Sequence, residues 1–250
     1  MSLELIALFE YIKIKERFDL LTKNSIMDWI KNRRGSTNPL TQKNDDPVRR
    51  YRTMKEEEQM TDIKMTKDSD CRTWSLQDPM LIEYHDNEWC KESHDDRHIF
   101  EMLCLEGQSV GLSWRTIINK RQAYKEVFCD FDIEKCAALT DEYLDGLMQD
   151  ERLIRNKAKI YSVRRNAIAA KKVIEEYGSL DSFFWSYTDG KQIDEHWETT
   201  ADMPAENELS RKMSRDLKKL GMSFVGPIIT YSFMQAIGLV NDHLADCAYR

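Results

Sequence analysis

The sequence predicts an all-α domain, and three observations carry this prediction. Several stretches repeat apolar residues with the 3.6-residue period of a helix. No stretch of the main domain alternates apolar and polar residues as a half-buried strand would. The segment Ile228 to Val240 is apolar nearly all round and follows Pro227, which favours the first position of a helix. We therefore expect a central, buried helix near the C-terminus.

The expected elements follow one another along the chain. Residues 3–34 carry apolar side chains at helical spacing, and residues 188–207 are polar and typical of a loop. In the main domain, helices are predicted at residues 99–107, 116–128, 141–150, 154–177, from 181 onward, at 209–220 and at 228–240.

Composition divides the chain into three parts. Residues 1–34 are predicted to form an amphipathic helical extension of unknown role. Residues 35–70 are rich in Ser, Thr, Asn, Pro and charge, which is typical of a flexible linker. Residues 71–250 contain the aromatic and apolar side chains needed for one main core, and they are expected to form the functional domain.

The overall composition fits a soluble intracellular protein. Of the 250 residues, 41% are hydrophobic and 32% charged, and no apolar run reaches the roughly 18 residues that cross a membrane. The segment Leu3 to Phe9 is too short for a secretory signal. Without such a signal, the six cysteines indicate reduced thiols or metal ligands and not a disulfide scaffold. We expect a cytoplasmic protein.

The charge distribution leaves a polyanionic partner open. The net charge of −7 argues against such a partner, but residues 152–172 contain eight basic side chains and no acidic one. This run is either a phosphate-binding patch or a solvated helix face.

Glu106 conflicts with its surroundings in the sequence. If residues 99–107 are helical, Glu106 shares a face with Ile99, Met102 and Leu103, at the end of an apolar stripe. A buried carboxylate needs a partner or a function, because its desolvation is unfavourable. The alternative is a side chain that extends to the rim and is solvated.

Histidine and cysteine pairs occur at both ends of the main domain. His243 and Cys247 are four residues apart, which would place them on one face of a helix, and Cys71 and His85 form a second pair. Two nitrogens and two sulfurs suit a closed tetrahedral Zn²⁺ site, which is structural and not catalytic. The alternative is a thiol near a histidine without a metal.

Two further groups have both a functional and a structural interpretation. The aromatic residues Trp74, Tyr84, Trp89 and Trp114 could line a pocket for a flat ligand or belong to the core. The segment 217–227 resembles two helices joined by a turn, with a glycine at each end of the turn. Its backbone N–H groups could bind a phosphate, or the helices could simply pack together.

Several long motifs resemble the DNA-3-methyladenine glycosylase I (Tag) family over about residues 71–250. They are Cys71, Gln77-Asp78-Pro79, residues 84–89, 100–108, 111–114, 224–226, 231–236 and 238–243. The resemblance implies an α-helical fold of the helix-hairpin-helix glycosylase superfamily. It also implies a structural Zn²⁺ held by Cys71, His85, His243 and Cys247, which joins the two ends of the domain.

The resemblance assigns roles to the other candidate residues. Glu106, as the catalytic residue, and Tyr84 would contact the excised base, and Trp114, Trp74 and Trp89 would form aromatic walls. Gly111 and Leu112 match the segment that fills the gap in the duplex. The hairpin from Gly221 to Gly226 matches the part that binds DNA phosphates.

The implied function is base-excision repair. The enzyme would hydrolyse the N-glycosidic bond of 3-methyladenine in alkylated double-stranded DNA, and we expect it to act as a monomer. Pro227 stands where lyase-type relatives carry a lysine, and Asn241 stands where many relatives carry a catalytic aspartate. We therefore expect a monofunctional enzyme with no lyase step.

Departures from the family pattern motivate one alternative. Cys90 replaces a usual glycine, Leu81 replaces an aromatic of some relatives, and the first seventy residues are additional. A non-catalytic module that binds DNA lesions and keeps the fold would fit these changes. A zinc hydrolase fits less well, because four protein ligands leave no open position for water.

Overall fold

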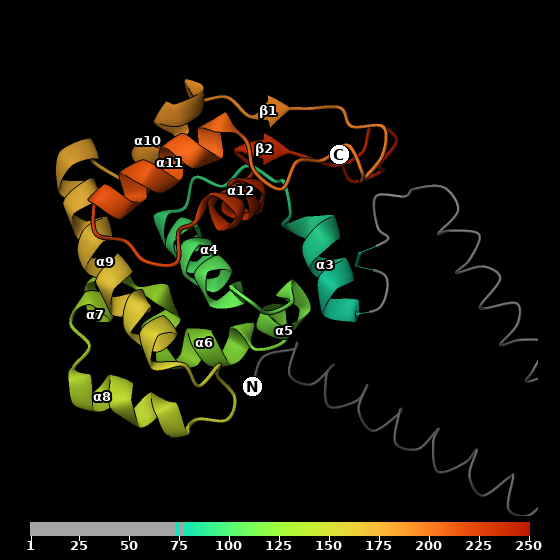
Figure 1. Ribbon diagram of the computed structural model, residues 1–250. Coiled ribbons are helices and arrows are strands. Elements are labelled where there is room, and N and C mark those ends of the chain that lie inside the picture. Colours follow the sequence, from blue (N-terminus) through green and yellow to red (C-terminus); the bar gives the residue numbers. More distant parts are fainter. Residues whose placement is uncertain (1–73, 76–77) are drawn as a thin grey trace, which may run out of the picture. The chain divides into compact units, whose positions relative to one another are not determined.

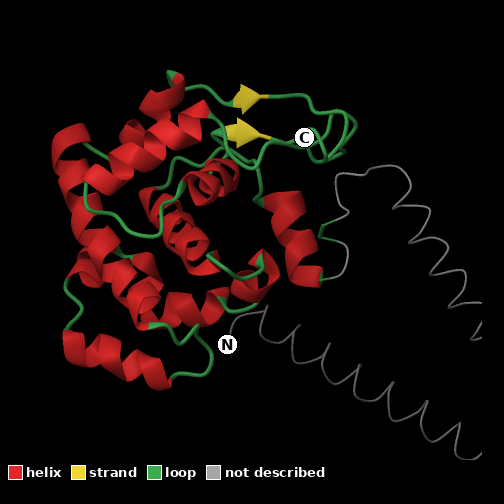
Figure 2. Cartoon of the chain, viewed as in Figure 1, coloured by secondary structure: helices red, strands yellow, loops and turns green. Residues whose placement is uncertain are grey.

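A computed structural model describes residues 74–75 and 78–250, and these form a mostly helical domain (Figures 1 and 2). The predictions for residues 1–34, for residues 35–70 and for Cys71 lie outside the described residues. The helices are α3 (Pro79–Asn87), α4 (Asp96–Ser109), α5 (Trp114–Ile118), α6 (Arg121–Val127), α7 (Ile133–Ala137), α8 (Asp141–Gly146), α9 (Lys157–Tyr177), α10 (Leu180–Trp185), α11 (Glu208–Lys219) and α12 (Pro227–Ala236). The strands are β1 (Ile193–Asp194) and β2 (Val240–Asn241), and the short 3-10 helices are η3 (Cys129–Phe131), η4 (Leu147–Gln149) and η5 (Ser186–Thr188).

Helix α4 is the centre of the domain. Every residue from Ile99 to Ser109 is buried, and α4 packs against α5, α9, α10 and α12 (Figure 1). The Asp95 side chain begins the helix by accepting a hydrogen bond from the backbone N–H of His98 at 2.9 Å. Because α4 is covered on all sides, its polar side chains Glu101, Glu106 and Gln108 are buried together with its apolar ones.

Local sequence signals define the ends of several helices. Pro79 and Pro227 stand in the first turns of α3 and α12, where the missing N–H leaves no bond unmade. Helix α9 begins after Asn156, whose side chain caps the N–H of Lys159, and ends at Gly178 with φ of +90°. These signals explain why the predicted helices 154–177 and 209–220 lie within three residues of α9 and α11.

The all-α prediction is confirmed except for a short parallel strand pair. Ile193 and Asp194 of β1 pair with Val240 and Asn241 of β2. The predicted helix 228–240 is wrong in its last turn, because α12 ends at Ala236 and Gly238 takes φ of +74°. The residues beyond this turn are therefore free to pair with β1 inside the segment predicted to be a loop.

Two other predicted helices differ from the structure. The predicted helix 116–128 is divided into α5 and α6, because the Asn119 amide between them donates to Asp78 Oδ2 at 2.8 Å and to the Arg115 carbonyl at 2.9 Å. The segment from Asn241 to Cys247 is not helical. His243 and Cys247 are brought together by turns and not by helical spacing.

Among the described residues, every helix is too short or too polar to cross a lipid bilayer.

Candidate active site and metal centre

Glu106 is a buried carboxylate in the last turn of α4. Its residue is only 6% exposed, and no basic side chain pairs with it in the part of the chain that the structure describes. Burial raises the pKa of Glu106 to about 8, although a hydrogen bond from the neighbouring Ser109 side chain acts in the opposite direction. The side chain does not extend into solvent at the rim, so the solvated alternative is wrong.

Tyr84 and Trp114 lie together beside this carboxylate. Their ring centroids are 5.3 Å apart, although Tyr84 comes from α3 and Trp114 from the start of α5. Burial raises the pKa of Tyr84, and the charge of Glu106 raises it further, since the two groups are close in space. Three elements therefore place a carboxylate, a phenol and an indole in one site.

The indole nitrogen of Trp114 is an unsatisfied donor. Trp114 Nε1 is buried and has no hydrogen-bond partner among the described residues. An unpaired buried N–H destabilises a fold by about 1–3 kcal/mol, so native proteins rarely retain one without a reason. Such a group is suited to donate to an acceptor atom of a ligand.

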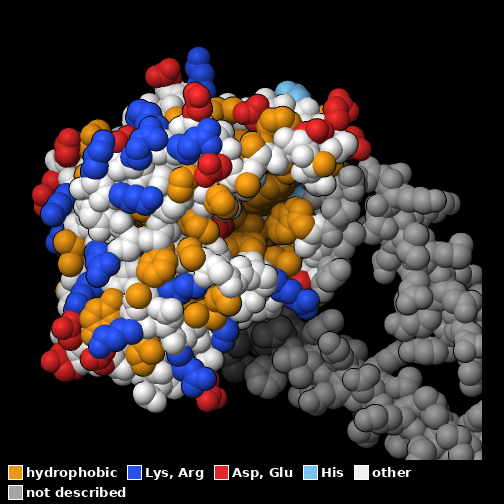
Figure 3. Space-filling model, in the orientation of Figure 1, with side chains coloured by type: hydrophobic (Ala, Val, Ile, Leu, Met, Phe, Trp, Pro, Cys, Tyr) orange, Lys and Arg blue, Asp and Glu red, His pale blue; other side chains and the backbone are white. Residues whose placement is uncertain are grey.

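Figure 3 shows a hollow on this face of the molecule, between the surfaces over α3, α4 and α12. Hydrophobic side chains line the hollow, and Lys and Arg side chains gather on the same face over α9 and α11. Such an apolar hollow suits a flat, partly apolar ligand.

The other two predicted aromatic walls lie nearer to the histidines. The ring centroid of Trp89 lies 5.5 Å from that of His85 and 4.8 Å from that of His243. Trp74 is 37% exposed, and its ring lies 6.5 Å from Tyr84 and 5.4 Å from Trp89. Trp74 thus connects the two groups, and Trp89 covers the histidine cluster.

Residues 110–113 form an exposed loop between α4 and α5. Gly111 takes φ of +75°, a conformation that other residues rarely adopt. Leu112 is 42% exposed at this loop, which makes it one of the few large aliphatic side chains on the described surface. The two residues predicted to enter the duplex are therefore accessible.

The predicted hairpin is formed by α11, the turn 220–226 and α12. Gly221 takes φ of +92°, and Gly226 precedes the first residue of α12. The turn is fixed on α9, because Asn166 Oδ1 accepts from the N–H of Ser223 at 2.8 Å. A Cβ on Gly107 of α4 would lie 3.2 Å from Cβ of Phe224, so the turn also packs closely on the central helix.

His85, His243 and Cys247 form a buried cluster of metal-binding side chains. Their ligand atoms all lie within 4.8 Å of one another. His85 Nδ1 lies 2.8 Å from Asp86 Oδ1, and His243 Nδ1 lies 3.1 Å from Asn241 Oδ1. Metal-binding histidines in proteins usually have such a partner for the second ring nitrogen. Burial lowers the pKa of His243 to about 4, which keeps this imidazole neutral.

This donor set fits a metal ion. Two imidazoles and a thiol are soft and borderline ligands of the kind that zinc prefers. The cluster joins α3 to the C-terminal segment, as expected, although the fourth predicted ligand, Cys71, lies outside the described residues.

The basic run of residues 152–172 is largely neutralised. Five of its basic side chains form ion pairs: Arg152 with Glu126 and Asp150, Arg155 with Glu151, Lys157 with Asp145, Arg164 with Asp141, and Lys171 with Glu134. Lys159 is buried, and Arg165 donates to Ser223 Oγ at 2.8 Å in the hairpin turn. Most of this run is therefore a salt-bridged helix face, and Arg165 is the member that reaches the hairpin.

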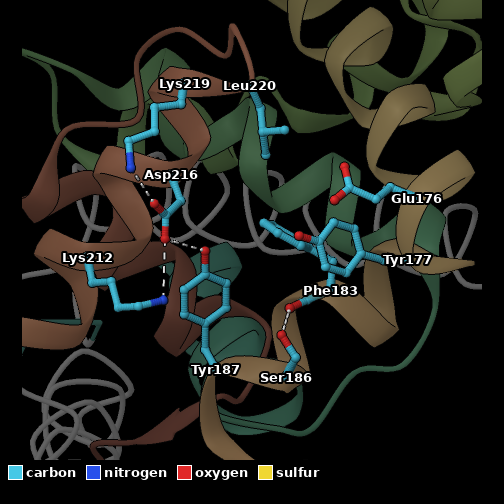
Figure 4. Close-up of a pocket in the computed structure, with 9 residues that line it drawn as sticks. All are labelled: Glu176, Tyr177, Phe183, Ser186, Tyr187, Lys212, Asp216, Lys219 and Leu220. Carbon is cyan, nitrogen blue, oxygen red and sulfur yellow. Dashed lines mark hydrogen bonds and ion pairs between the residues drawn. The ribbon is translucent and has the colours of Figure 1, made fainter.

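A separate cleft of about 400 Å³ lies between α9, α10 and α11 (Figure 4). Asp216 points to its centre and accepts from Tyr187 Oη at 3.1 Å, with Lys212 and Lys219 at 3.3 and 3.2 Å. Three donors therefore satisfy this carboxylate, and the other acid that lines the cleft, Glu176, is exposed and not buried as Glu106 is. None of the predicted site residues lines it.

Comparison with known proteins agrees with this geometry. The methyladenine glycosylase family matches residues 74–250. The chain belongs to this family. It is 42% identical over 174 residues to DNA-3-methyladenine glycosylase 1 of Escherichia coli strain K12, covering 70% of this chain and 93% of that protein. It is 41% identical over 175 residues to DNA-3-methyladenine glycosylase of Haemophilus influenzae, covering 70% of this chain and 94% of that protein.

The fold also agrees with a solved member of the methyladenine glycosylase family. The structure of 3-methyladenine DNA glycosylase I from Staphylococcus aureus superposes with a TM-score of 0.71 at 35% identity. The match covers 73% of this chain and 97% of that one. The described domain therefore corresponds to nearly the whole of its relatives.

The departures from the family pattern have a structural setting. Cys90 takes φ of +61°, a conformation that favours glycine, in agreement with the glycine that the family resemblance implies at this position. Its Sγ accepts from the N–H of Asp242 at 3.3 Å, so the thiol is buried in the domain. Leu81 is buried, at 4% exposure.

Sequence reasoning missed one buried polar centre of this family member. Asp242 is fully buried and accepts hydrogen bonds from Trp197 Nε1, Tyr231 Oη and Gln235 Nε2 at 2.7–2.8 Å. It therefore ties the segment before α11 to helix α12. The only signal was its position next to the predicted ligand His243, which gave no indication of its partners.

Proposed function

We propose that the protein is a DNA-3-methyladenine glycosylase, which hydrolyses the N-glycosidic bond of 3-methyladenine in alkylated double-stranded DNA. The observation that carries the proposal is the buried carboxylate of Glu106, which has no basic partner among the described residues, beside the rings of Tyr84 and Trp114. The names of the relatives from Escherichia coli and Haemophilus influenzae support the same substrate.

The chemistry of the substrate matches this site. 3-Methyladenine is positively charged while it is attached to the sugar, so aromatic faces attract it by about 0.5–2 kcal/mol each. The carboxylate of Glu106 favours the cation further, because a charge pair is stronger in a buried site than in water. The same positive charge makes the base a good leaving group, so strong acid catalysis is unnecessary.

Each part of the site then has a role. Glu106 recognises the base and stabilises the positive charge that develops on the sugar, with water as the nucleophile. Tyr84 and Trp114 contact the extruded base, with Trp74 and Trp89 behind them. Extrusion costs a few kcal/mol and least for a poorly paired, methylated base, which favours damaged adenine over normal adenine.

The loop and the hairpin supply the DNA contacts in this proposal. Gly111 and Leu112 fill the gap left by the extruded nucleotide. The turn between Gly221 and Gly226 binds phosphates through its backbone N–H groups at the start of α12, where the helix dipole favours an anion.

We further propose that residues 71–250 form the catalytic domain and that His85, His243, Cys247 and Cys71 hold one structural Zn²⁺. A metal at this site would connect the two ends of the domain and take no part in catalysis, because four protein ligands leave no open position. The chemistry then belongs to Glu106 and its aromatic neighbours.

The reaction would end at hydrolysis. Pro227 replaces the lysine that a lyase would use to form a Schiff base, and Asn241 contacts His243 instead of serving as a catalytic acid. The expected product is an intact abasic strand. A covalent protein–DNA adduct trapped by borohydride would contradict this.

The decisive experiment is release of free base from methylated double-stranded DNA by the full chain. We expect release of 3-methyladenine by the wild type and at least tenfold slower release by Glu106→Gln, measured by chromatography of the free base. Binding of methylated DNA without any release would instead identify a non-catalytic lesion-binding module.

A further inference from the structure

Lys159 is a buried lysine that binds backbone and not an acid. It is 5% exposed, and burial alone lowers its pKa, with no contribution from a charged neighbour among the described residues. Its ammonium donates to the carbonyl of Gln108 at 2.8 Å and to the carbonyl of Val110 at 2.6 Å. Both carbonyls lie where α4 ends and the exposed loop begins.

The end of a helix is a suitable place for this charge. The last carbonyls of α4 have no partners within the helix, and they carry its negative dipole. A lysine that reaches them satisfies two acceptors and places a positive charge against the dipole. The contact is reciprocal, because Gln108 Nε2 donates to the Lys159 carbonyl at 2.9 Å. Helices α4 and α9 are therefore locked together at this point.

The same contact fixes the backbone around Gly111. Lys159 holds the carbonyl of Val110 on one side, and on the other side the N–H of Leu112 donates to the Ser109 carbonyl at 2.7 Å. Ser113 then caps α5, accepting from the N–H of Thr116 at 3.3 Å. Leu112 and Val110 are the exposed aliphatic side chains of this loop, which is held at three points, and Leu112 is the more exposed of the two at 42% against 38%.

We propose that Lys159 is a positioning residue for DNA binding: its ammonium holds the loop 110–113 so that Leu112 enters the duplex where the base has left. The inference rests on the proposed function, because it takes Leu112 as the wedge. Lys159 itself is buried and touches neither the base nor a phosphate. Its effect passes through the Val110 carbonyl to the loop.

The test compares DNA with and without a gap in the stack. The probes are a duplex carrying one tetrahydrofuran abasic analogue and the same duplex without it, bound to the full chain. Lys159→Met keeps the apolar stem and removes the ammonium, and we expect the preference for the abasic duplex to fall about tenfold. Leu112→Ala should reduce it similarly, and the double variant should lose little more than either single one.

Lys157→Met is the matched control. This substitution removes the same charge two residues earlier on α9. The Lys157 side chain, however, is 62% exposed and pairs with Asp145 at 2.7 Å. We expect it to keep the wild-type preference. Affinity for free 3-methyladenine should be unchanged within twofold in Lys159→Met, since general damage to the fold would weaken base and DNA binding together.

The outcomes separate this inference from the proposed function. Wild-type preference in Lys159→Met, losses that add fully to those of Leu112→Ala, or a parallel loss of free-base affinity would each overturn the positioning role. If the wild type releases no base, the glycosylase activity is rejected. If Lys159→Met still lowers the preference for the abasic duplex in that case, the positioning role stands. If Lys159→Met is unfolded by its melting curve, Lys159→Gln, which keeps a donor, replaces it, and an intermediate loss is expected.

Discussion

The rings of Tyr84 and Trp114 lie 5.3 Å apart, and the buried indole N–H of Trp114 has no partner among the described residues. The pair joins α3 to α5 at the site that contains Glu106. An aromatic pair alone would be ordinary packing, but an unpaired donor beside a buried carboxylate is the arrangement expected of a site that binds a polar ligand.

Trp114→Phe removes this unpaired donor. We expect the free energy of unfolding to fall by about 1 kcal/mol or less, because the lost ring area is offset by removal of an unsatisfied group. Affinity for 3-methyladenine should fall about 2- to 10-fold, the value of one hydrogen bond. Thermal unfolding and titration with the free base measure the two effects.

Trp185→Phe is the matched control for this change. Trp185 is buried in α10, and its Nε1 already donates to the Ser93 carbonyl at 3.0 Å. The same substitution should therefore lower stability by about 2–3 kcal/mol and leave base affinity unchanged. Equal stability losses in the two variants would show that Trp114 Nε1 is not an unsatisfied donor.

Glu106→Gln should stabilise the protein at neutral pH. The pKa of Glu106 is about 8 in the folded state and near 4.5 when unfolded, so between these values the folded chain keeps a proton that the unfolded chain loses. Stability therefore falls as the pH rises from about 4.5 to 8. Gln removes this effect, so the variant should gain at most about 3 kcal/mol in free energy of unfolding at pH 7 and nothing at pH 4. Denaturant unfolding at both pH values checks it, and a variant less stable at pH 7 contradicts it.

The same raised pKa predicts the pH dependence of excision. If the carboxylate form of Glu106 binds the cationic base, kcat/KM should rise about tenfold per pH unit up to about pH 8 and then level, since kcat/KM reports the free enzyme. Glu106→Gln should be slower and should lack this rise. A wild-type profile that is flat between pH 6 and 8 would contradict the assignment.

Removal of the metal-binding side chains should remove one metal ion per chain. Cys247→Ser or His243→Ala should lose bound metal and lower the melting temperature by about 6–12 °C, equivalent to roughly 3 kcal/mol for a domain of this size. Metal analysis and calorimetry measure the two effects. Cys129→Ser changes a free cysteine outside the cluster and should keep the metal. If the wild type contains no metal after purification without chelators, the proposed metal site is wrong.

Gly238→Ala should be among the most damaging small substitutions. The added Cβ would lie 2.3 Å from the backbone of Lys91, and φ is +74°. We expect a loss of more than about 3 kcal/mol. Gly190→Ala is the control, because φ is similar at +72° but no atom lies within 4 Å of the added Cβ. It should lose only about 1 kcal/mol, as judged by thermal unfolding.

The sequence predicted those parts of the fold that depend on local signals. Helix α9 ends at Tyr177, just before Gly178, and α12 begins at Pro227 as expected, because glycine readily takes the positive φ that ends a helix and proline suits the first helical position. Glu106 was identifiable because a charge interrupts an apolar period. These features are encoded within one or two turns of chain.

Features that depend on distant contacts could not be predicted in the same way. His243 and Cys247 meet through turns that Gly238 and the pairing with β1 create, and not through helical spacing. Lys159 looked like one member of a basic run, but its environment is set by carbonyls about fifty residues earlier. Nothing near these residues in the sequence encodes their partners.

The histidine cluster also bears on the order in which the domain folds. His85 and His243 are 158 residues apart, and their rings lie 4.9 Å from each other. During synthesis, the cluster cannot form until the segment with His243 and Cys247 has left the ribosome, because long-range contacts wait for the chain that connects them. Helices α5, α9 and α10, which also pack against α4, come earlier in the chain and can pack before the cluster forms. A chain truncated just before Cys247 would therefore keep most of its buried core residues but lack one member of the His85, His243 and Cys247 cluster.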